Sequence, residues 1–236
     1  MATVNFTGNG QQKTLAELFC SPGLAAELRG QLTFISVLNS LLSVSAFLGN
    51  ALILIALHKE SSLHPPSKLL LRNLLTTDLC VGLISEPLYV AYFMSVANER
   101  WNICPRLLLA SFITGYILCG ASVSTLTAIS VDRLLALLLG LRYRQVVTLG
   151  RTYAIVITTW VIAAVFPAMR FWNPLITLWY VTIAIPLYLL ISTISYTKIF
   201  LTLRHHQNQV QDHVQQPNQA NQLNRARYKK AGASAI

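Results

Sequence analysis

Three polar side chains stand inside long apolar stretches of this 236-residue sequence and are the first candidates for chemistry. Asn50, Asp78 and Ser122 lie about 10, 14 and 16 Å from the ends of their apolar runs, at the rise of a helix. Three helices would therefore carry a polar group at one depth. These groups can form a hydrogen-bonded network or, with water, bind a small cation such as Na⁺ at Asp78. The plain network is the simpler interpretation, because polar contacts between membrane helices are common.

A second candidate is the pair Asp132-Arg133, which directly follows the apolar residues 126–131. Adjacent opposite charges at the end of a partly buried helix can neutralise each other, and a guanidinium held in this way can exchange partners. The alternative is a pair that only anchors its helix at the membrane interface. Taken alone, the pair does not decide between these two interpretations.

The elements that must position these residues are membrane-spanning helices. The sequence is 54% hydrophobic and 11% charged, whereas a soluble domain carries about 25% charged residues. This composition argues against a large soluble enzyme and, despite a net charge of +10, against a nucleic-acid partner. Crossing a bilayer takes about 20 mostly apolar residues. Five segments satisfy this, and we expect spans at about residues 32–57, 69–93, 105–139, 152–169 and 175–203.

The positions of the basic residues predict the orientation. Thirteen of the 18 Lys and Arg residues fall on the side that carries Arg133, which the positive-inside rule makes cytoplasmic. We therefore expect a multi-pass membrane protein whose residues 1–31 form an extracellular tail, with a glycosylation sequon at Asn5. Residues 204–230 would be a cytoplasmic Gln/Asn-rich loop, and residues 231–236 would begin a sixth helix that is cut short.

In combination, these residues resemble the rhodopsin-like class (class A) of G-protein-coupled receptors. The motifs, in chain order, are Gly49-Asn50, Asn73-Leu74 with Asp78-Leu79, Asp132-Arg133-Leu134, Leu141-Arg142-Tyr143, Trp160 and Pro186. Each motif is weak alone, but their order, spans and sides of the membrane agree with the family. The fold that this resemblance implies is an all-α membrane protein with five transmembrane helices of a seven-helix bundle.

The resemblance also implies a plasma-membrane location and a function, which is to bind an extracellular ligand and activate heterotrimeric G proteins rather than to act as an enzyme. It assigns G-protein coupling to Asp132, Arg133 and Leu134, with the carboxylate of Asp132 restraining Arg133. It assigns the family's sodium-linked network to Asn50, Asp78 and Ser122. No other cofactor is implied, and we expect a chain without the sixth and seventh helices not to signal.

The expected ligand pocket lies near the outer ends of the second and third spans. Its candidate residues are Glu86, Tyr89, Tyr92, Gly115, Tyr116 and Cys119. Glu86 could meet a cationic ligand, although a carboxylate paired with Arg100 or facing water is at least as consistent. Monoamine receptors carry an aspartate at the height of Gly115 and Tyr116, so an amine receptor is disfavoured. The loop between spans four and five is short and in this respect resembles the same loop of melanocortin, adenosine and lipid-sensing receptors.

The positions of the cysteines differ from the pattern that is usual in this family. Its members usually tie the outer end of the third span to the second extracellular loop by a disulfide, but residues 169–177 contain no cysteine. Cys20 and Cys104 would both face an oxidising compartment, so we hypothesise that they pair, although spacing alone does not set connectivity. Cys80 and Cys119 are expected to pack inside the membrane as small apolar groups.

Two other classes of function remain open at this point. The chain could be a five-span interaction protein that binds other, full-length receptor chains through the exposed faces of its third and fifth spans. It could also be a small transporter or channel with Asp78 and Glu86 along its pathway. Internal repeats would favour the transporter, and the early and late spans show no such similarity.

Overall fold

The computed structural model describes residues 15–169, 174–205 and 207–209, and within these ranges every regular element is helical. Among the described residues, five helical stretches are long and apolar enough to cross a membrane: Pro22–Lys59, Pro65–Ala97, Cys104–Val146, Leu149–Ala168 and Tyr180–Gln209. The predicted all-α membrane fold with five spans is confirmed. The sequon at Asn5, most of the Gln/Asn-rich segment and the expected start of a sixth helix lie outside the described residues.

The first long helix begins well before the apolar run that predicted it. Helix α2 (Pro22–Lys59) starts directly after Ser21, whose hydroxyl oxygen accepts the backbone N–H of Leu24 at 3.5 Å, and proline occupies its first position. Glu27 and Arg29 lie in its first turns, so a search for uncharged residues could not reach the true start. A short helix, α1 (Leu15–Phe19), precedes it.

Two spans contain a turn of π-helix, and in each case a proline follows closely. The second span consists of α3 (Pro65–Cys80), the π-helix η1 (Val81–Ser85) and α4 (Glu86–Ala97), which carries Pro87. The π-helix η4 (Tyr180–Ala184) similarly precedes Pro186. Proline lacks an N–H and clashes with the carbonyl four residues earlier, so the chain widens its turn there. The wide turns face the cavity that forms the candidate site below.

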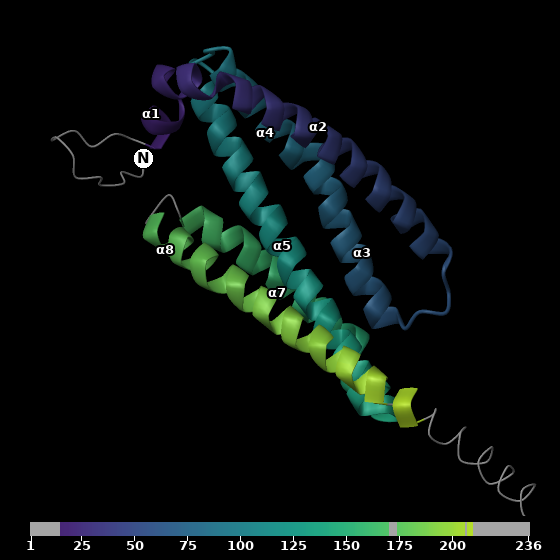
Figure 1. Cartoon of the computed structure of the whole chain (residues 1–236). Coiled ribbons are helices and arrows are strands. Elements are labelled where there is room, and N and C mark those ends of the chain that lie inside the picture. The colour runs from purple at the N-terminus through teal and green to yellow at the C-terminus, as the bar shows by residue number, and fades with distance from the viewer. Residues whose placement is uncertain (1–14, 170–173, 206, 210–236) are drawn as a thin grey trace, which may run out of the picture. The chain divides into compact units, whose positions relative to one another are not determined.

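Helix α5 (Cys104–Leu139) packs against α3, α4 and α7 (Leu149–Ala168), so it connects the two sides of the first compact unit, residues 1–192 (Figure 1). Beyond it, the 3₁₀ turn η2 (Gly140–Arg142) and the short helix α6 (Tyr143–Val146) lead towards α7. Helix α8 (Pro174–Trp179) then runs into η4. In the second unit, residues 193–236, the described residues 193–205 and 207–209 are helical.

The buried hydrophobic cluster lies at the end of the unit where α2 begins. It contains Ala25 and Leu32 of α2, Tyr92, Val96 and Ala97 of α4, and Cys104 and Leu108 of α5. Burial of these side chains explains why α2 extends beyond its purely apolar stretch. Elsewhere large apolar side chains are exposed, as a lipid-facing surface requires; Leu52, for example, is 67% exposed.

Close contact between α2 and η1 depends on a glycine. A Cβ atom built on Gly82 would lie 2.8 Å from the backbone nitrogen of Phe47 and 2.8 Å from the carbonyl oxygen of Ser43. The Ser43 hydroxyl donates to the Gly82 carbonyl at 2.6 Å. The missing side chain therefore lets two helix backbones meet, which is a common device in membrane helix packing.

Candidate functional site

A cavity of ≈ 430 Å³ lies among α3, η1, α4, α5 and η4, a size in the range of small-molecule sites. Its lining residues are Asp78, Val81, Ser85, Glu86, Tyr89, Gly115, Tyr116, Cys119, Gly120, Ser122, Tyr180, Val181 and Ile185. Five of the six residues expected in a ligand pocket are in this set. Two residues of the expected polar network, Asp78 and Ser122, line the same cavity, so the network and the pocket form one site.

Tyr92, the sixth residue expected in the pocket, is not among those that line this cavity. It is buried in the hydrophobic cluster, and its hydroxyl donates to the backbone carbonyl of Phe19 at 3.3 Å. The reason is helical periodicity. Tyr92 follows Glu86 by six residues, which rotates its side chain about 120° away from that of Glu86 on the helix.

Aromatic rings shape the walls of the cavity. The phenol of Tyr89 passes so close to α5 that a Cβ atom on Gly115 would lie 2.6 Å from its oxygen. On the side of η4, the rings of Tyr180 and Phe166 stack with centroids 4.5 Å apart. Tyr116 stacks on Phe112 of its own helix at 5.9 Å. Gly115 therefore belongs to the site because it makes room for Tyr89.

The polar network forms around Asp78, but without one of its expected members. Ser122 donates to Oδ1 of Asp78 at 2.6 Å and lies 2.9 Å from the hydroxyl oxygen of Thr77. The Asn50 amide instead donates to the carbonyl of Ala46 on its own helix, at 2.8 Å. Within the described part of the chain, no hydrogen bond joins Asn50 to Asp78. Two of the three predicted residues are therefore in contact.

A second polar contact joins three helices and was not predicted. The Asn73 amide donates to the hydroxyl of Thr125 on α5 at 2.8 Å, and the indole N–H of Trp160 on α7 donates to the Asn73 oxygen at 3.0 Å. The sequence motifs include both Asn73 and Trp160 but do not join them. The asparagine inside an apolar span was the available signal, since a buried amide needs partners.

Asp132 is buried and accepts two hydrogen bonds. The hydroxyl of Ser67 on α3 donates to Oδ2 at 2.7 Å, and the hydroxyl of Tyr143 on α6 donates to Oδ1 at 2.7 Å. The expected pairing with Arg133 is absent: among the described residues, Asp132 makes no ion pair with the exposed Arg133. Consecutive helical side chains point about 100° apart, so Asp132 faces α3 and α6 while Arg133 faces outward. Leu134 is half-buried.

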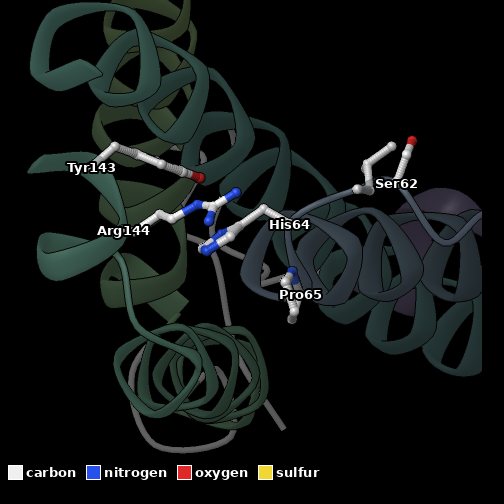
Figure 2. Close-up of a pocket in the computed structure, with 6 residues that line it drawn as sticks. Ser62, His64, Pro65, Tyr143 and Arg144 are labelled. Carbon is white, nitrogen blue, oxygen red and sulfur yellow. The ribbon is translucent and has the colours of Figure 1, made fainter. Parts of the chain in front are cut away.

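Tyr143 also forms the wall of a second cavity, at this same end of the helices. Figure 2 shows Tyr143, Arg144 and His64 around this space of ≈ 490 Å³, with the Arg144 and His64 side chains directed toward each other. The rings of His64 and Tyr143 lie 5.3 Å apart. The Tyr143 side chain, which donates to Asp132, therefore also contacts His64 in the loop between α2 and α3.

The structure contains a disulfide between Cys20 and Cys104, with their Cα atoms 6.1 Å apart. It ties the segment between α1 and α2 to the first residue of α5, next to the hydrophobic cluster. The two other cysteines are free thiols. Cys80 is half-buried, whereas Cys119 is exposed and lines the candidate cavity, so the expectation that Cys119 packs as a buried apolar group is wrong.

Comparison with known proteins identifies the family. The model of the family "7 transmembrane receptor (rhodopsin family)" matches residues 49–173, and the chain belongs to this family. The D(4) dopamine receptor of Homo sapiens is 32% identical over 134 residues, 56% of this chain and 32% of that receptor. The adenosine receptor A2b of Rattus norvegicus is 32% identical over 126 residues, 53% and 36% of the two chains.

A longer alignment joins the chain to the muscarinic acetylcholine receptor M3 of Pongo pygmaeus, which is 30% identical over 182 residues, 72% of this chain and 30% of that receptor. The chain spans about a third of the length of the curated relatives it matches. The predicted membership of the rhodopsin-like receptors is confirmed. All of these relatives are receptors.

Proposed function

We propose that this chain supplies the ligand pocket and part of the G-protein-coupling surface of a receptor that responds to an extracellular ligand. The observation that carries the proposal is that one helix, α5, contributes to both sites. Five of its residues, from Gly115 to Ser122, line the cavity, and Asp132 and Arg133 lie about 15 Å beyond Ser122 along the same helix. A rigid helix can couple events at its two ends.

The cavity favours a small ligand that carries positive charge or several hydrogen-bonding groups. Two carboxylates, Asp78 and Glu86, line it with the hydroxyls of Tyr89, Tyr116 and Tyr180. No described residue forms an ion pair with Glu86, so its carboxylate is available to a ligand. This arrangement offers a place for a cation even though α5 carries Gly115 and Tyr116 where monoamine receptors carry an aspartate.

At the other end, the exposed Arg133 offers a guanidinium to a G protein. Its neighbour Asp132 is held by Ser67 and Tyr143, so the carboxylate fixes α5 to α3 and α6 rather than masking the arginine. A ligand that prefers one arrangement of α5 would shift the population of receptor states by its differential affinity. In the proposed orientation, this end is cytoplasmic and the N-terminus is extracellular.

Sodium is proposed as an allosteric ion at Asp78. The carboxylate of Asp78 and the hydroxyls of Ser122 and Thr77 gather oxygen atoms of the kind that hard cations prefer. The ion would supply only charge. Asp78 would hold it and Ser122 would orient the carboxylate, while Asn50 would have to leave Ala46 to take part.

The test is G-protein nucleotide exchange in membranes from cells that express the 236-residue chain extended by the sixth and seventh helices of the D(4) dopamine receptor. We expect measurable basal exchange, and we expect Arg133→Ala to reduce it by tenfold or more. Arg142→Ala, which removes another exposed arginine nearby, is the matched control and should change exchange by less than about twofold. Full exchange by Arg133→Ala would reject the coupling role.

A second candidate function is that of an interaction partner for other receptor chains. The observation that favours it is the polar lining of the cavity, in which two carboxylates, those of Asp78 and Glu86, lie within a membrane-spanning stretch. Charged groups at such positions are costly in a bilayer, so other helices should cover them. Co-purification of the 236-residue chain with the full-length D(4) dopamine receptor would support this function. Weaker co-purification after Glu86→Leu would indicate that receptor helices, rather than lipid, cover this carboxylate. Absence of any complex would argue against this function.

A further inference from the structure

A third cavity, of ≈ 270 Å³, lies where α2 ends and α3 begins, and it shares no lining residue with the two cavities described above. Its lining combines apolar and basic side chains: Leu54, Ile55, Leu57 and His58 from α2, and Lys68 and Arg72 from α3. We propose that this cavity binds an anionic phospholipid, whose phosphate meets the basic residues while an acyl chain follows the leucines and isoleucine.

The two helices present these groups on matching faces. Lys68 and Arg72 are four residues apart and therefore lie on one side of α3, one turn above the other. Leu54, Leu57 and His58 share the spacing that places them on one side of α2. The cavity is consequently basic along α3 and apolar along α2. Such a surface fits a lipid better than a soluble anion, because a soluble anion has no acyl chain to pack against the apolar side chains.

Arg72 lacks a partner that would explain its position in a span. Its side chain is exposed, and the guanidinium makes no hydrogen bond or ion pair with any described residue. The span Pro65–Ala97 has 33 residues and is about 50 Å long, so Arg72, about 10 Å from its start, lies near the boundary between head groups and hydrocarbon. A charge at this depth is stabilised by reaching a lipid phosphate.

The neighbouring acid does not satisfy Arg72. Glu60 accepts the backbone N–H of Ser62 at 2.8 Å, and hydrogen bonds from Ser62 hold the pKa of Glu60 below its usual range. The Lys68 ammonium donates to the backbone carbonyl of Glu60, which fixes the lysine at the edge of the cavity. Lys68 is thus positioned by the loop, and Arg72 keeps its full donor capacity for a ligand.

The test is native mass spectrometry of the purified 236-residue chain in detergent, titrated with phosphatidylserine or with phosphatidylcholine of the same acyl chains. Each Lys or Arg near an anionic head group contributes about fivefold to binding, so we expect at least a fivefold preference for phosphatidylserine. Lys68→Gln with Arg72→Gln should abolish the preference. Lys198→Gln with Arg204→Gln removes one exposed lysine and one exposed arginine elsewhere and should retain it.

Two results would overturn the proposal: no preference in the unaltered chain, or an equal loss in both double variants, which would indicate general attraction to a basic protein. A measurement on the unaltered chain covers the case in which the α3 variant does not fold. Photoactivatable phosphatidylserine should label peptides within residues 54–72. Labelling confined to other segments would contradict the site.

Discussion

The hydroxyl of Tyr143 donates to Oδ1 of Asp132 at 2.7 Å, across eleven residues of sequence that contain the end of α5 and the turn into α6. Ser67 occupies the other carboxylate oxygen. Asp132 therefore links three helices. Its partner in this structure is a tyrosine of the connecting segment and not the adjacent arginine.

This contact predicts the effect of Tyr143→Phe. The change removes one of two donors to a buried carboxylate, and an unsatisfied buried acceptor costs about 1–3 kcal/mol. Thermal unfolding of the purified chain should show a lower midpoint. Tyr153→Phe, at a tyrosine that is 50% exposed, is the control and should leave the midpoint unchanged. Equal midpoints for Tyr143→Phe and the unaltered chain would show that the bond does not stabilise the fold.

The contact of η1 with α2 predicts that Gly82 tolerates no side chain. A methyl group there would lie 2.8 Å from the backbone of α2, so Gly82→Ala should force the helices apart and cost about 1–3 kcal/mol. The same thermal measurement applies. Gly150→Ala is the matched control, because a Cβ atom there meets nothing within 4 Å and alanine favours the helix. A tolerated Gly82→Ala would mean that the two backbones are further apart.

The disulfide predicts a change in thiol count. After denaturation without reductant, maleimide labelling followed by intact mass should detect only the free thiols of Cys80 and Cys119. Cys20→Ser should add one reactive thiol, that of Cys104, and lower stability by about 2–5 kcal/mol because the crosslink is lost. Cys80→Ser should instead remove one label. Four labels on the unaltered chain would exclude the disulfide.

The proposed ion at Asp78 predicts a sodium-dependent midpoint of unfolding. An ion that binds only the folded state stabilises it, so the unaltered chain should unfold at a higher temperature in NaCl than in choline chloride at equal ionic strength. Asp78→Asn removes the charge and should abolish the difference. If the unaltered chain unfolds alike in both salts, Asp78 serves only the hydrogen-bonded network with Ser122.

The sequence by itself determined the membrane class, the number of spans and the family. The first two follow from the length and order of apolar runs, because a bilayer of fixed thickness imposes a minimum span and charged residues mark its ends. The family follows from the order of the short motifs that these spans carry. It also placed Glu86, Tyr89, Gly115, Tyr116 and Cys119 near one another, since each lies at a similar height on its predicted helix.

Only the tertiary structure decided which polar groups meet and which face each helix turns inward. Ser67 and Asp132 are 65 residues apart in the chain, and Asn73 and Trp160 are 87 apart, so no local pattern joins them. Height along a helix is set by residue number, but direction around it is set by the neighbours against which it packs. For this reason Tyr92 lies in the hydrophobic cluster, and Asp132 binds Tyr143 rather than Arg133.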